Sequence, residues 1–349
     1  MKLLILTQKV DKDDSVLGFF HRWLEEFAKK CEKVTVICLY KGRVELPSNV
    51  KVFSLGKEEM LSRVIMLYRF FLYIIRERKN YDKVFVHMNQ VYVILGGLLW
   101  RLMGKEIGLW YVHKQVTRSL RIALLLTHHV FTSAKESFGI ESKKVHYVGH
   151  GIDVGNFMRP ADYVRGSWAR PRIIHVGRIT PIKHCEVLIK AAAILRDSYS
   201  VSIEVLFVGA PTNDSDNVYF ETLREMVRAS KLESSVRFVG SIPNYMVREY
   251  YWNTDLSANM CPNGGMDKSV LESIAAGVPA FVSNSVFVDV LGKYKDDFIF
   301  EFNNPNSLAE KIAVYLKRND RASVAEEMTI VAKRFDVKSL VEKIISYLK

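Results

Sequence analysis

The sequence predicts an α/β protein of two consecutive domains, each built on a parallel sheet with helices on both faces. Its 349 residues suit two domains of ordinary size, each able to bury its own core. Short runs rich in β-branched residues alternate with helical patterns along most of the chain, as in β–α repeats. A turn-rich span at residues 149–171 divides the chain into two such series.

The first series defines an expected domain over residues 1–160. Its predicted strands cover residues 2–7, 34–39, 51–53, 83–87, 107–111, 130–132 and 145–148. Its predicted helices lie between the strands, at residues 18–30, 62–79, 91–103 and 119–127. This alternation predicts a parallel sheet covered on both faces.

The second series defines an expected domain over residues 161–335. Its predicted strands cover residues 172–176, 203–208, 236–239, 255–258, 280–283 and 298–300. Its predicted helices cover residues 185–196, 217–230, 244–251, 269–276, 307–318 and 321–335. A last helix at 337–349, within residues 336–349, is expected to pack back on the first domain. Ligands of open α/β sheets bind beyond the carboxyl ends of the strands, so we expect two facing domains with the site in the cleft between them.

The positive charge of the chain is concentrated in its first half. Residues 1–160 hold 26 Lys and Arg against 15 Asp and Glu, whereas the remainder holds 24 against 23. Such a basic half indicates an anionic partner, either nucleic acid or a membrane surface with anionic lipid. The sequence has no zinc-finger spacing, no RNP-like motif and no dense Arg/Lys recognition helix, which disfavours nucleic acid. We therefore expect an anionic membrane surface.

Cysteine usage and hydropathy predict a cytoplasmic protein. Cys31, Cys38, Cys185 and Cys261 are scattered without a CxxC pair, as expected of reduced, buried thiols. The apolar run at residues 3–6 is too short for a signal peptide, and the run at 91–100 is too short for a bilayer span. We expect a cytoplasmic chain that binds peripherally to the inner face of the plasma membrane.

Residues 63–79 form a basic, aromatic-rich helical pattern with two interpretations. The helix could lie in a membrane interface. It could instead pack on the sheet with its basic residues outward, and an aromatic stripe favours this second interpretation.

Residues 261–279, CPNGGMDKSVLESIAAGVP, form the most informative motif. Gly264 and Gly265 allow a backbone to approach a ligand closely, and an apolar helix follows directly. The amides at the start of this helix favour an anion, and Glu272 can accept hydrogen bonds from sugar hydroxyls. The pattern is typical of a nucleotide or nucleotide-sugar site, although a surface loop beside a solvated glutamate fits it equally well.

Three further motifs lie where predicted strands end. Gly177, Arg178 and Lys183 follow the strand at 172–176 and place two cations five residues apart, which suits a diphosphate leaving group. Glycine also follows the strand at 203–208, and residues 239–243 form a turn that can offer backbone groups to a base.

Together with residues 145–153, these motifs resemble glycosyltransferase family 4, whose members have the GT-B architecture of two Rossmann-like domains. The resemblance covers nearly the whole chain. It implies a retaining hexosyltransferase that needs no metal or other cofactor and takes a UDP- or GDP-linked sugar as its donor substrate. It implies an acceptor that is a glycan or a lipid-linked saccharide.

The same resemblance implies roles for individual residues of the second domain. Arg178 and Lys183 would act on the donor diphosphate and count with His113 as the catalytic set. Glu272 would bind the ribose hydroxyls. The remaining donor-binding residues would be Gly177, Ser241, Ile242, Gly264, Gly265, Met266, Asp267 and the amides of Ser269 and Val270.

For the first domain, the resemblance places a histidine beside the transferred sugar, and His113 follows the strand at 107–111 in that position. Gly18 stands where the family has a glycine-rich turn, here with one glycine only. His21 and Asn89, with His87, are candidates for the acceptor side. Buried structural roles fit these last three equally well.

One departure from the family pattern concerns the donor sugar. The family has two acidic residues separated by seven, and the position of the first one is Gly264 in this chain. Either Asp267 replaces the missing acid or backbone amides alone hold the sugar. The DxD spacings at residues 11–13 and 214–216 lie in polar loops, and we interpret both as solvated turns.

Two other functions remain alternatives. A non-catalytic nucleotide-sugar-binding protein fits the missing acid. A dinucleotide-dependent oxidoreductase fits the β–α repetition, but no GxGxxG follows the first strand.

Overall fold

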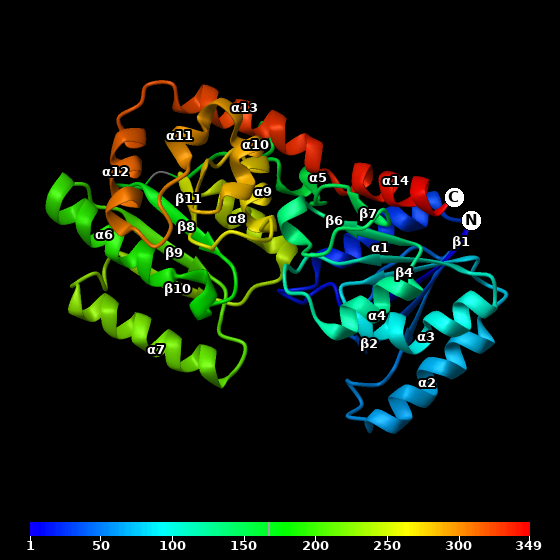
Figure 1. Cartoon of the computed structure of the whole chain (residues 1–349). Coiled ribbons are helices and arrows are strands. Elements are labelled where there is room, and N and C mark those ends of the chain that lie inside the picture. Colours follow the sequence, from blue (N-terminus) through cyan, green and yellow to red (C-terminus); the bar gives the residue numbers. More distant parts are fainter. Residues whose placement is uncertain (167) are drawn as a thin grey trace. The chain divides into compact units, whose positions relative to one another are not determined.

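The computed structural model describes residues 1–166 and 168–349, which form two compact units. The first unit comprises Met1–Gly151 together with Asp336–Lys349, and the second comprises Ile152–Phe335. The boundary thus lies at Gly151, whereas the sequence pattern placed it at residue 160. Figure 1 shows both units coloured along the chain.

The first unit contains a seven-stranded sheet in the order β3-β2-β1-β4-β5-β6-β7, and all neighbouring strands are parallel. Its strands are β1 (Lys2–Val10), β2 (Lys33–Lys41), β3 (Val50–Ser54), β4 (Lys83–His87), β5 (Glu106–Trp110), β6 (His129–Thr132) and β7 (Val145–Tyr147). The seven strands predicted for this half of the chain are all present.

Helices cover both faces of this sheet and build two separate cores. One face carries α2 (Arg63–Arg76), α3 (Gln90–Leu102) and α4 (Arg118–Leu126). The other face carries α1 (Phe19–Lys30) and α14 (Val337–Leu348). A short 3₁₀ turn, η1 (Lys135–Ser137), follows β6. In α1, Phe20, Trp23, Leu24 and Phe27 are buried and recur at the spacing of one helical face.

Helix α14 returns to the first unit, as the sequence predicted. Asp336 caps its start by accepting a hydrogen bond from the Lys338 amide at 2.8 Å. Leu340, Val341, Ile344 and Leu348 are buried in the same core as α1. The apolar face of α14 therefore completes the first unit.

The second unit contains a five-stranded parallel sheet in the order β10-β9-β8-β11-β12. Its strands are β8 (Arg172–Val176), β9 (Glu204–Val208), β10 (Val236–Gly240), β11 (Leu256–Asn259) and β12 (Ala280–Val282). The sixth strand predicted at 298–300 is wrong. Residues up to Phe298 close the helix α11 (Lys295–Phe298), and Ile299 makes only an isolated bridge to Val282.

The helices of the second unit pack around one continuous core. The longer ones are α6 (Cys185–Tyr199), α7 (Asp214–Ala229), α8 (Val247–Trp252), α9 (Lys268–Ala275), α12 (Pro305–Leu316) and α13 (Arg321–Ala332). The short ones are α5 (Val154–Phe157), α10 (Val288–Leu291), η2 (Pro181–Lys183), η3 (Asn244–Met246), η4 (Ser285–Phe287), η5 (Gly292–Tyr294) and η6 (Lys333–Phe335).

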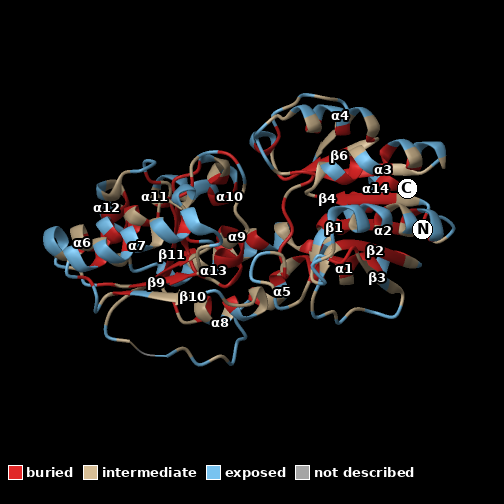
Figure 2. Cartoon of the chain, turned by 90° about the horizontal axis from the view of Figure 1, so that it is seen from below, coloured by how far each residue is buried: buried red, intermediate tan, exposed pale blue. Residues whose placement is uncertain are grey.

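Helices α2, α3 and α4 expose many large apolar side chains, and we call their outer sides the α2–α4 face. Helix α2 packs on the sheet mainly through the fully buried Phe70 and Ile74, whereas Val64 is 77% and Tyr68 66% exposed. The other exposed apolar residues of this face are Ile65, Leu67, Leu72, Ile75, Val91, Leu95, Leu98, Leu102, Ile122 and Leu125. Figure 2 shows the exposed outer sides of these helices. Helix α2 thus packs on the sheet with basic residues outward, as the favoured interpretation predicted, but its outer side carries apolar residues as well.

The four cysteines are free and buried, and burial raises the pKa of Cys31 to about 11. Within the described residues, no helix combines the length and the apolarity needed to cross a bilayer.

Candidate functional site

The order of the strands in the second unit defines where its site lies. Strand β8 has β9 on one side and β11 on the other, so the chain reverses its direction of travel across the sheet at this point. In open α/β sheets, ligands bind at such a switch point, outside the carboxyl ends of the strands. The loop after β8 carries Lys183, and the loop after β11 carries Asp267.

Lys183 and Asp267 form an ion pair at this switch point. Nζ of Lys183 lies 2.8 Å from one carboxylate oxygen of Asp267 and 3.0 Å from the other. Asn259, the last residue of β11, donates to the same carboxylate at 2.9 Å. Burial opposes ionisation of Asp267, but the Lys183 ammonium and hydrogen bonds from Cys261 and Asn259 hold its pKa far below the usual range. The cation predicted to bind the diphosphate is thus paired with an internal carboxylate.

A glycine lies at the carboxyl end of each of three neighbouring strands: Gly177 after β8, Gly209 after β9 and Gly240 at the end of β10. The Gly177 amide donates to the Val208 carbonyl at 3.0 Å, and the Gly209 amide donates to the Gly240 carbonyl at 2.8 Å. A Cβ atom at Gly209 would lie 1.9 Å from the Gly177 carbonyl oxygen, so no other residue fits there without moving the backbone. Gly177 therefore sits on a tightly built turn.

The loop at residues 261–267 is anchored rather than flexible. The Ser283 hydroxyl donates to the Cys261 carbonyl at 2.9 Å, and Asn284 donates to the Gly265 carbonyl at 2.9 Å. The Asn263 side chain accepts from the Ser285 amide at 2.7 Å. Gly264 has φ +157° and open space beside its Cα, and Met266 packs against the core. The position of the missing acid, Gly264, therefore has space for a side chain, but its backbone has a positive φ that favours glycine.

The first turn of α9 keeps part of the predicted anion site. The Val270 amide donates to the Asp267 carbonyl at 3.3 Å, so it has a partner within the turn. The amide of Ser269 precedes the first intrahelical hydrogen bonds. It remains a donor that this helix start can direct at an anion.

Glu272 lies buried in α9, and its carboxylate accepts a hydrogen bond from Asn244 at 3.2 Å. Burial raises the pKa of Glu272 and lowers that of its helical neighbour Lys268. Asn244 begins η3 directly after the turn that contains Ser241 and Ile242. The expected base turn and the expected ribose carboxylate are therefore linked by one side chain, which sequence reasoning missed.

Arg178 is exposed, in contrast to Lys183. A hydrogen bond from Thr180 lowers the pKa of Asp216, and the positive charge of Arg178 lowers it further. Asp216 is 4% exposed and accepts hydrogen bonds from the Thr212 hydroxyl at 2.8 Å and from Asn213 at 2.9 Å. The interpretation of residues 214–216 as a solvated turn was therefore wrong, because Asp216 locks the start of α7.

The candidates in the first unit also surround a switch point, between β1 and β4. Gly18 immediately precedes α1, and a Cβ atom there would lie 2.3 Å from the Asp14 carbonyl oxygen. The Asp14 carboxylate accepts hydrogen bonds from the amides of Val16 at 2.9 Å and Leu17 at 2.6 Å. A carboxylate thus occupies the turn where the family resemblance placed an approach for phosphate or acceptor.

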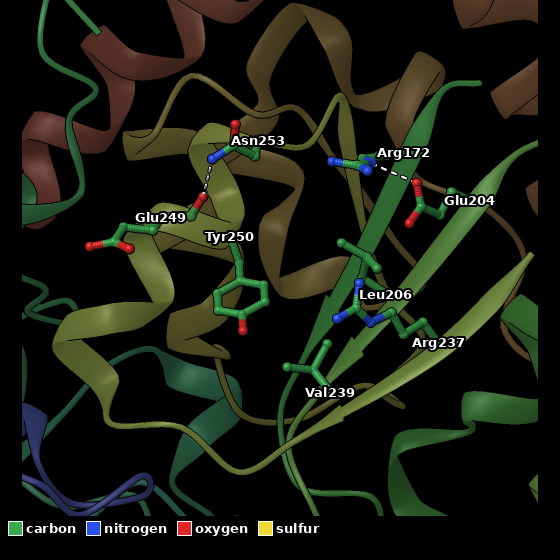
Figure 3. Close-up of a pocket in the computed structure, with 8 residues that line it drawn as sticks. All are labelled: Arg172, Glu204, Leu206, Arg237, Val239, Glu249, Tyr250 and Asn253. Carbon is green, nitrogen blue, oxygen red and sulfur yellow. Dashed lines mark hydrogen bonds and ion pairs between the residues drawn. The ribbon is translucent and has the colours of Figure 1, made fainter. Parts of the chain in front are cut away.

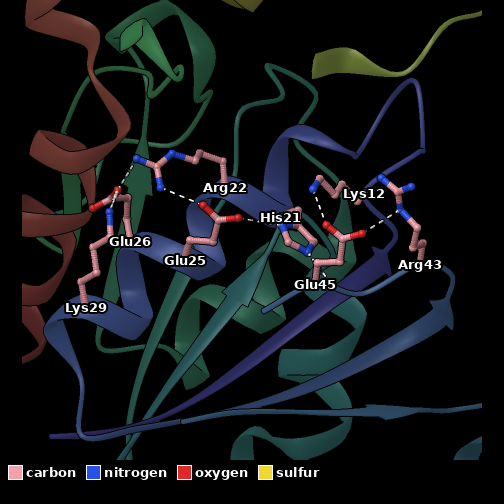
Figure 4. A network of polar contacts seen from close by, with 8 residues as sticks. All are labelled: Lys12, His21, Arg22, Glu25, Glu26, Lys29, Arg43 and Glu45. Carbon is pink, nitrogen blue, oxygen red and sulfur yellow. Dashed lines mark hydrogen bonds and ion pairs between the residues drawn. The ribbon is translucent and has the colours of Figure 1, made fainter. Parts of the chain in front are cut away.

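His21 is buried, and both of its ring nitrogens have protein partners. One lies 3.2 Å from the Glu25 carboxylate, and the other accepts from the Glu45 amide at 3.1 Å. Figure 4 shows this network, which continues through the ion pair of Glu45 with Lys12. Binding of an acceptor by His21 would have to exchange one of these contacts.

His87 ends β4 and Asn89 follows it beside this switch point, whereas His113 follows β5, one strand further along the sheet. His113 is exposed three residues beyond β5, and its ring lies edge-on to Tyr111. His87 is buried and stacks on Phe20 with ring centroids 4.0 Å apart. The Asn89 side chain caps α3 by accepting from the Val91 amide at 3.1 Å. Of the three, His113 is the one most open to a ligand.

A pocket of about 330 Å³ lies elsewhere on the second unit. Figure 3 shows its lining of Arg172, Glu204, Leu206, Arg237, Val239, Glu249, Tyr250 and Asn253. Arg172 and Glu204 begin β8 and β9, so the pocket reaches the amino ends of strands whose carboxyl ends carry the Lys183 loop. It contains none of the predicted site residues. Among the described residues, no group of three or more His, Cys, Asp or Glu side chains is placed to hold a metal ion.

Comparisons with known proteins agree with this placement. Residues 169–329 match the family model described as Glycosyl transferases group 1. D-inositol 3-phosphate glycosyltransferase from Thermomonospora curvata is 29% identical over 159 residues, which are 41% of this chain and only 36% of that protein.

Solved structures match the whole chain at low sequence identity. HepE from Anabaena, in complex with UDP and glucose, gives a TM-score of 0.77 at 17% identity, covering 100% of this chain and 99% of that chain. Sucrose-phosphate synthase from Thermosynechococcus elongatus gives 0.76 at 13% identity, covering 99% and 98%. Residues 169–329, which carry the Lys183–Asp267 pair and α9, therefore match the model of glycosyl transferases group 1, and the chain has the fold of two Rossmann-like, GT-B-type units.

Proposed function

We propose that this chain is a retaining, metal-independent glycosyltransferase. It transfers a hexose-type sugar from a UDP- or GDP-linked donor to a glycan or lipid-linked saccharide. The observation that carries the proposal is the convergence of Lys183 and the start of α9 at the switch point of a domain that matches glycosyl transferases group 1.

In this proposal the second unit binds the donor. Lys183, Arg178 and the amide of Ser269 face the diphosphate, whose negative charge grows as the glycosidic bond breaks. Glu272 accepts hydrogen bonds from the ribose hydroxyls, and the turn at Ser241 and Ile242 borders the base. These cations and this amide supply positive charge of the kind that a metal ion provides in other transferases.

The chemical step breaks the bond between the anomeric carbon and the phosphate oxygen. The acceptor hydroxyl attacks the same face of the sugar, and its proton passes to the departing phosphate oxygen. Configuration at the anomeric carbon is thereby retained. The exposed His113 of the first unit orients the transferred sugar.

The decisive experiment measures binding of UDP and GDP by calorimetry and sugar transfer from UDP- and GDP-hexoses. We expect Lys183→Ala to weaken binding of the nucleoside diphosphate by about tenfold or more, as loss of a charge-assisted contact does. Lys190→Ala is the matched control, because Lys190 is an exposed lysine on α6 of the same unit. The proposal fails if neither UDP nor GDP binds, or if Lys183→Ala and Lys190→Ala bind the nucleotide with the same affinity.

We propose that the acceptor lies at the cytoplasmic face of a membrane, to which the first unit binds. That unit holds 28 Lys and Arg against 16 Asp and Glu, whereas the second unit holds 22 of each. The exposed apolar side chains of the α2–α4 face lie among exposed cations, including Arg63, Arg101 and Arg121. Apolar residues among cations suit an anionic lipid surface.

Cosedimentation with vesicles tests this membrane proposal. We expect binding to vesicles with anionic lipid that weakens with salt, and little binding to phosphatidylcholine vesicles. Val64→Asp should reduce the binding to anionic vesicles, whereas Val218→Asp should leave it unchanged. Val218 is the matched control, because Val64 on α2 is 77% exposed and Val218 on α7 is 71% exposed. Equal loss in both variants, or no preference for anionic lipid, would rule the proposal out.

A further inference from the structure

His175 is a buried histidine inside β8, two residues before the Gly177 turn. Its side chain is 1% exposed, and its Nδ1 lies 3.0 Å from the Ala258 carbonyl oxygen on the neighbouring strand β11. A carbonyl oxygen can only accept, so Nδ1 must carry the proton. Burial lowers the pKa of His175 to about 4, which keeps the ring neutral near pH 7. Nε2 is therefore an unprotonated acceptor.

Nε2 of His175 is buried and has no hydrogen-bond partner among the described residues. Buried acceptors in folded proteins almost always have a partner, because an unmade hydrogen bond leaves the cost of desolvation uncompensated. Nε2 of His175 is one of six such buried atoms among the described residues, and its place two residues before the Gly177 turn indicates a partner that arrives when a ligand binds.

The space that Nε2 faces is shared with Lys183. A Cβ atom built on Gly177 would lie 3.6 Å from Nε2 and 3.8 Å from Cε of Lys183, with no other atom within 4 Å among the described residues outside 176–178. The small gap beside the Gly177 Cα is thus bounded by the imidazole on one side and by the lysine side chain on the other. The Lys183 ammonium itself is held by Asp267 at 2.8 Å.

Asp267 and His175 differ in charge as partners for the Lys183 ammonium, which also contacts the Cys261 thiol. Asp267 neutralises the ammonium and competes with an incoming diphosphate for it. A neutral imidazole can orient the ammonium through a hydrogen bond and leave its charge intact for the ligand.

We propose that His175 is a positioning residue for Lys183: its Nε2 accepts a hydrogen bond from the ammonium when a nucleoside diphosphate replaces Asp267. This inference rests on the proposed function, because it takes Lys183 to be the diphosphate-binding cation. It assigns a role to a strand residue that no motif in the chain singled out.

Binding of UDP and GDP to four variants tests the coupling. His175→Leu removes the acceptor and should weaken nucleotide binding by about tenfold, the loss expected for a hydrogen bond to a charged group. His175→Gln keeps an acceptor and should recover most of the affinity. In the Lys183→Ala background, His175→Leu should have no further effect. Equal weakening with and without Lys183 would show that His175 only supports the fold and would overturn the proposal.

A second measurement does not depend on the nucleotide. The Asp267→Asn variant removes the charged partner of Lys183, so the ammonium should turn to Nε2 without any ligand. Nitrogen NMR of labelled histidine should show the Nε2 resonance of His175 shifted from the position of a bare acceptor, and Lys183→Ala in the same variant should abolish the shift. An unshifted resonance would overturn the proposal. If the wild-type chain binds neither UDP nor GDP, the proposed function is wrong. The NMR measurement would then decide by itself whether His175 positions Lys183.

Discussion

Lys183 and Asp267 stand 84 residues apart in the sequence, yet both carboxylate oxygens of Asp267 lie within 3.0 Å of the Lys183 ammonium. The pair joins the two loops that flank the switch point between β8 and β11. An anionic ligand at this point has to compete with a carboxylate that is already bound. Binding of such a ligand to Lys183 would therefore require that the contact with Asp267 be exchanged or shared.

Asp267→Asn should tighten binding of UDP or GDP and lower the stability of the fold. The ammonium loses its charged competitor, but a partly buried lysine loses its charged partner, which should cost about 1–3 kcal/mol once solvent exposure is allowed for. Calorimetry and urea unfolding measure the two effects. Asp297→Asn, which breaks the Arg318 pair on the surface, is the control. Weaker nucleotide-sugar binding in Asp267→Asn would instead show that Asp267 replaces the missing acid and contacts the donor sugar.

Glu272→Gln should weaken binding of UDP more than binding of inorganic diphosphate. In the proposed function Glu272 contacts ribose hydroxyls, which inorganic diphosphate lacks, whereas Lys183→Ala should weaken binding of both ligands. Competition titration measures the ratio of the dissociation constants of UDP and inorganic diphosphate in each variant. Equal effects of Glu272→Gln on both ligands would exclude a ribose contact.

Gly209→Ala should destabilise the second unit far more than Gly240→Ala. Both glycines have positive φ, but a Cβ at Gly209 meets the Gly177 carbonyl at 1.9 Å, whereas a Cβ at Gly240 meets nothing within 4 Å. We expect a loss of about 1 kcal/mol for Gly240→Ala from backbone strain and about 2–4 kcal/mol for Gly209→Ala, where the backbone must also shift. Urea unfolding monitored by fluorescence measures both. Similar losses would mean that the Gly177 turn can move freely.

Acidification should destabilise the protein partly through His175. The folded pKa of about 4 lies below the usual value of 6.5, so between these pH values the unfolded chain binds a proton that the native state does not. Stability should therefore fall as the pH drops from 6.5 to 4, by at most about 3 kcal/mol from this group. His175→Gln should flatten that part of the pH profile of the unfolding free energy. An unchanged slope would show that His175 is protonated in the native state.

The parts of the fold that depend on local pattern could be predicted from the sequence. Strand β8 and helix α9 follow from runs of apolar residues with the periodicity of their element, bounded by turn residues. The contact between Lys183 and Asp267 could not be predicted, because it depends on β11 lying beside β8, which local periodicity does not encode. The Asn244–Glu272 contact was missed for the same reason.

One error came from treating buried apolar residues as evidence of a strand. The aromatic and aliphatic residues at 298–300 suggested a strand, but Phe298 ends α11, and Ile299 makes only an isolated bridge to Val282. In α2 the aromatic stripe predicted a helix packed on the sheet, and the buried Phe70 confirms it. The stripe did not predict that Tyr68, two residues earlier, is 66% exposed.

The return of α14 to the first unit sets an order for assembly on the ribosome. Residues 152–335 form one uninterrupted stretch, so the second unit can close as soon as that stretch has left the exit tunnel. The first unit lacks Leu340, Ile344 and Leu348 until residues 336–349 have been made, so one apolar side of α1 stays uncovered throughout synthesis of the second unit. Residues 1–151 therefore precede the second unit in the sequence but complete their core after it, and nascent-chain proteolysis should cleave them readily until residue 348 emerges.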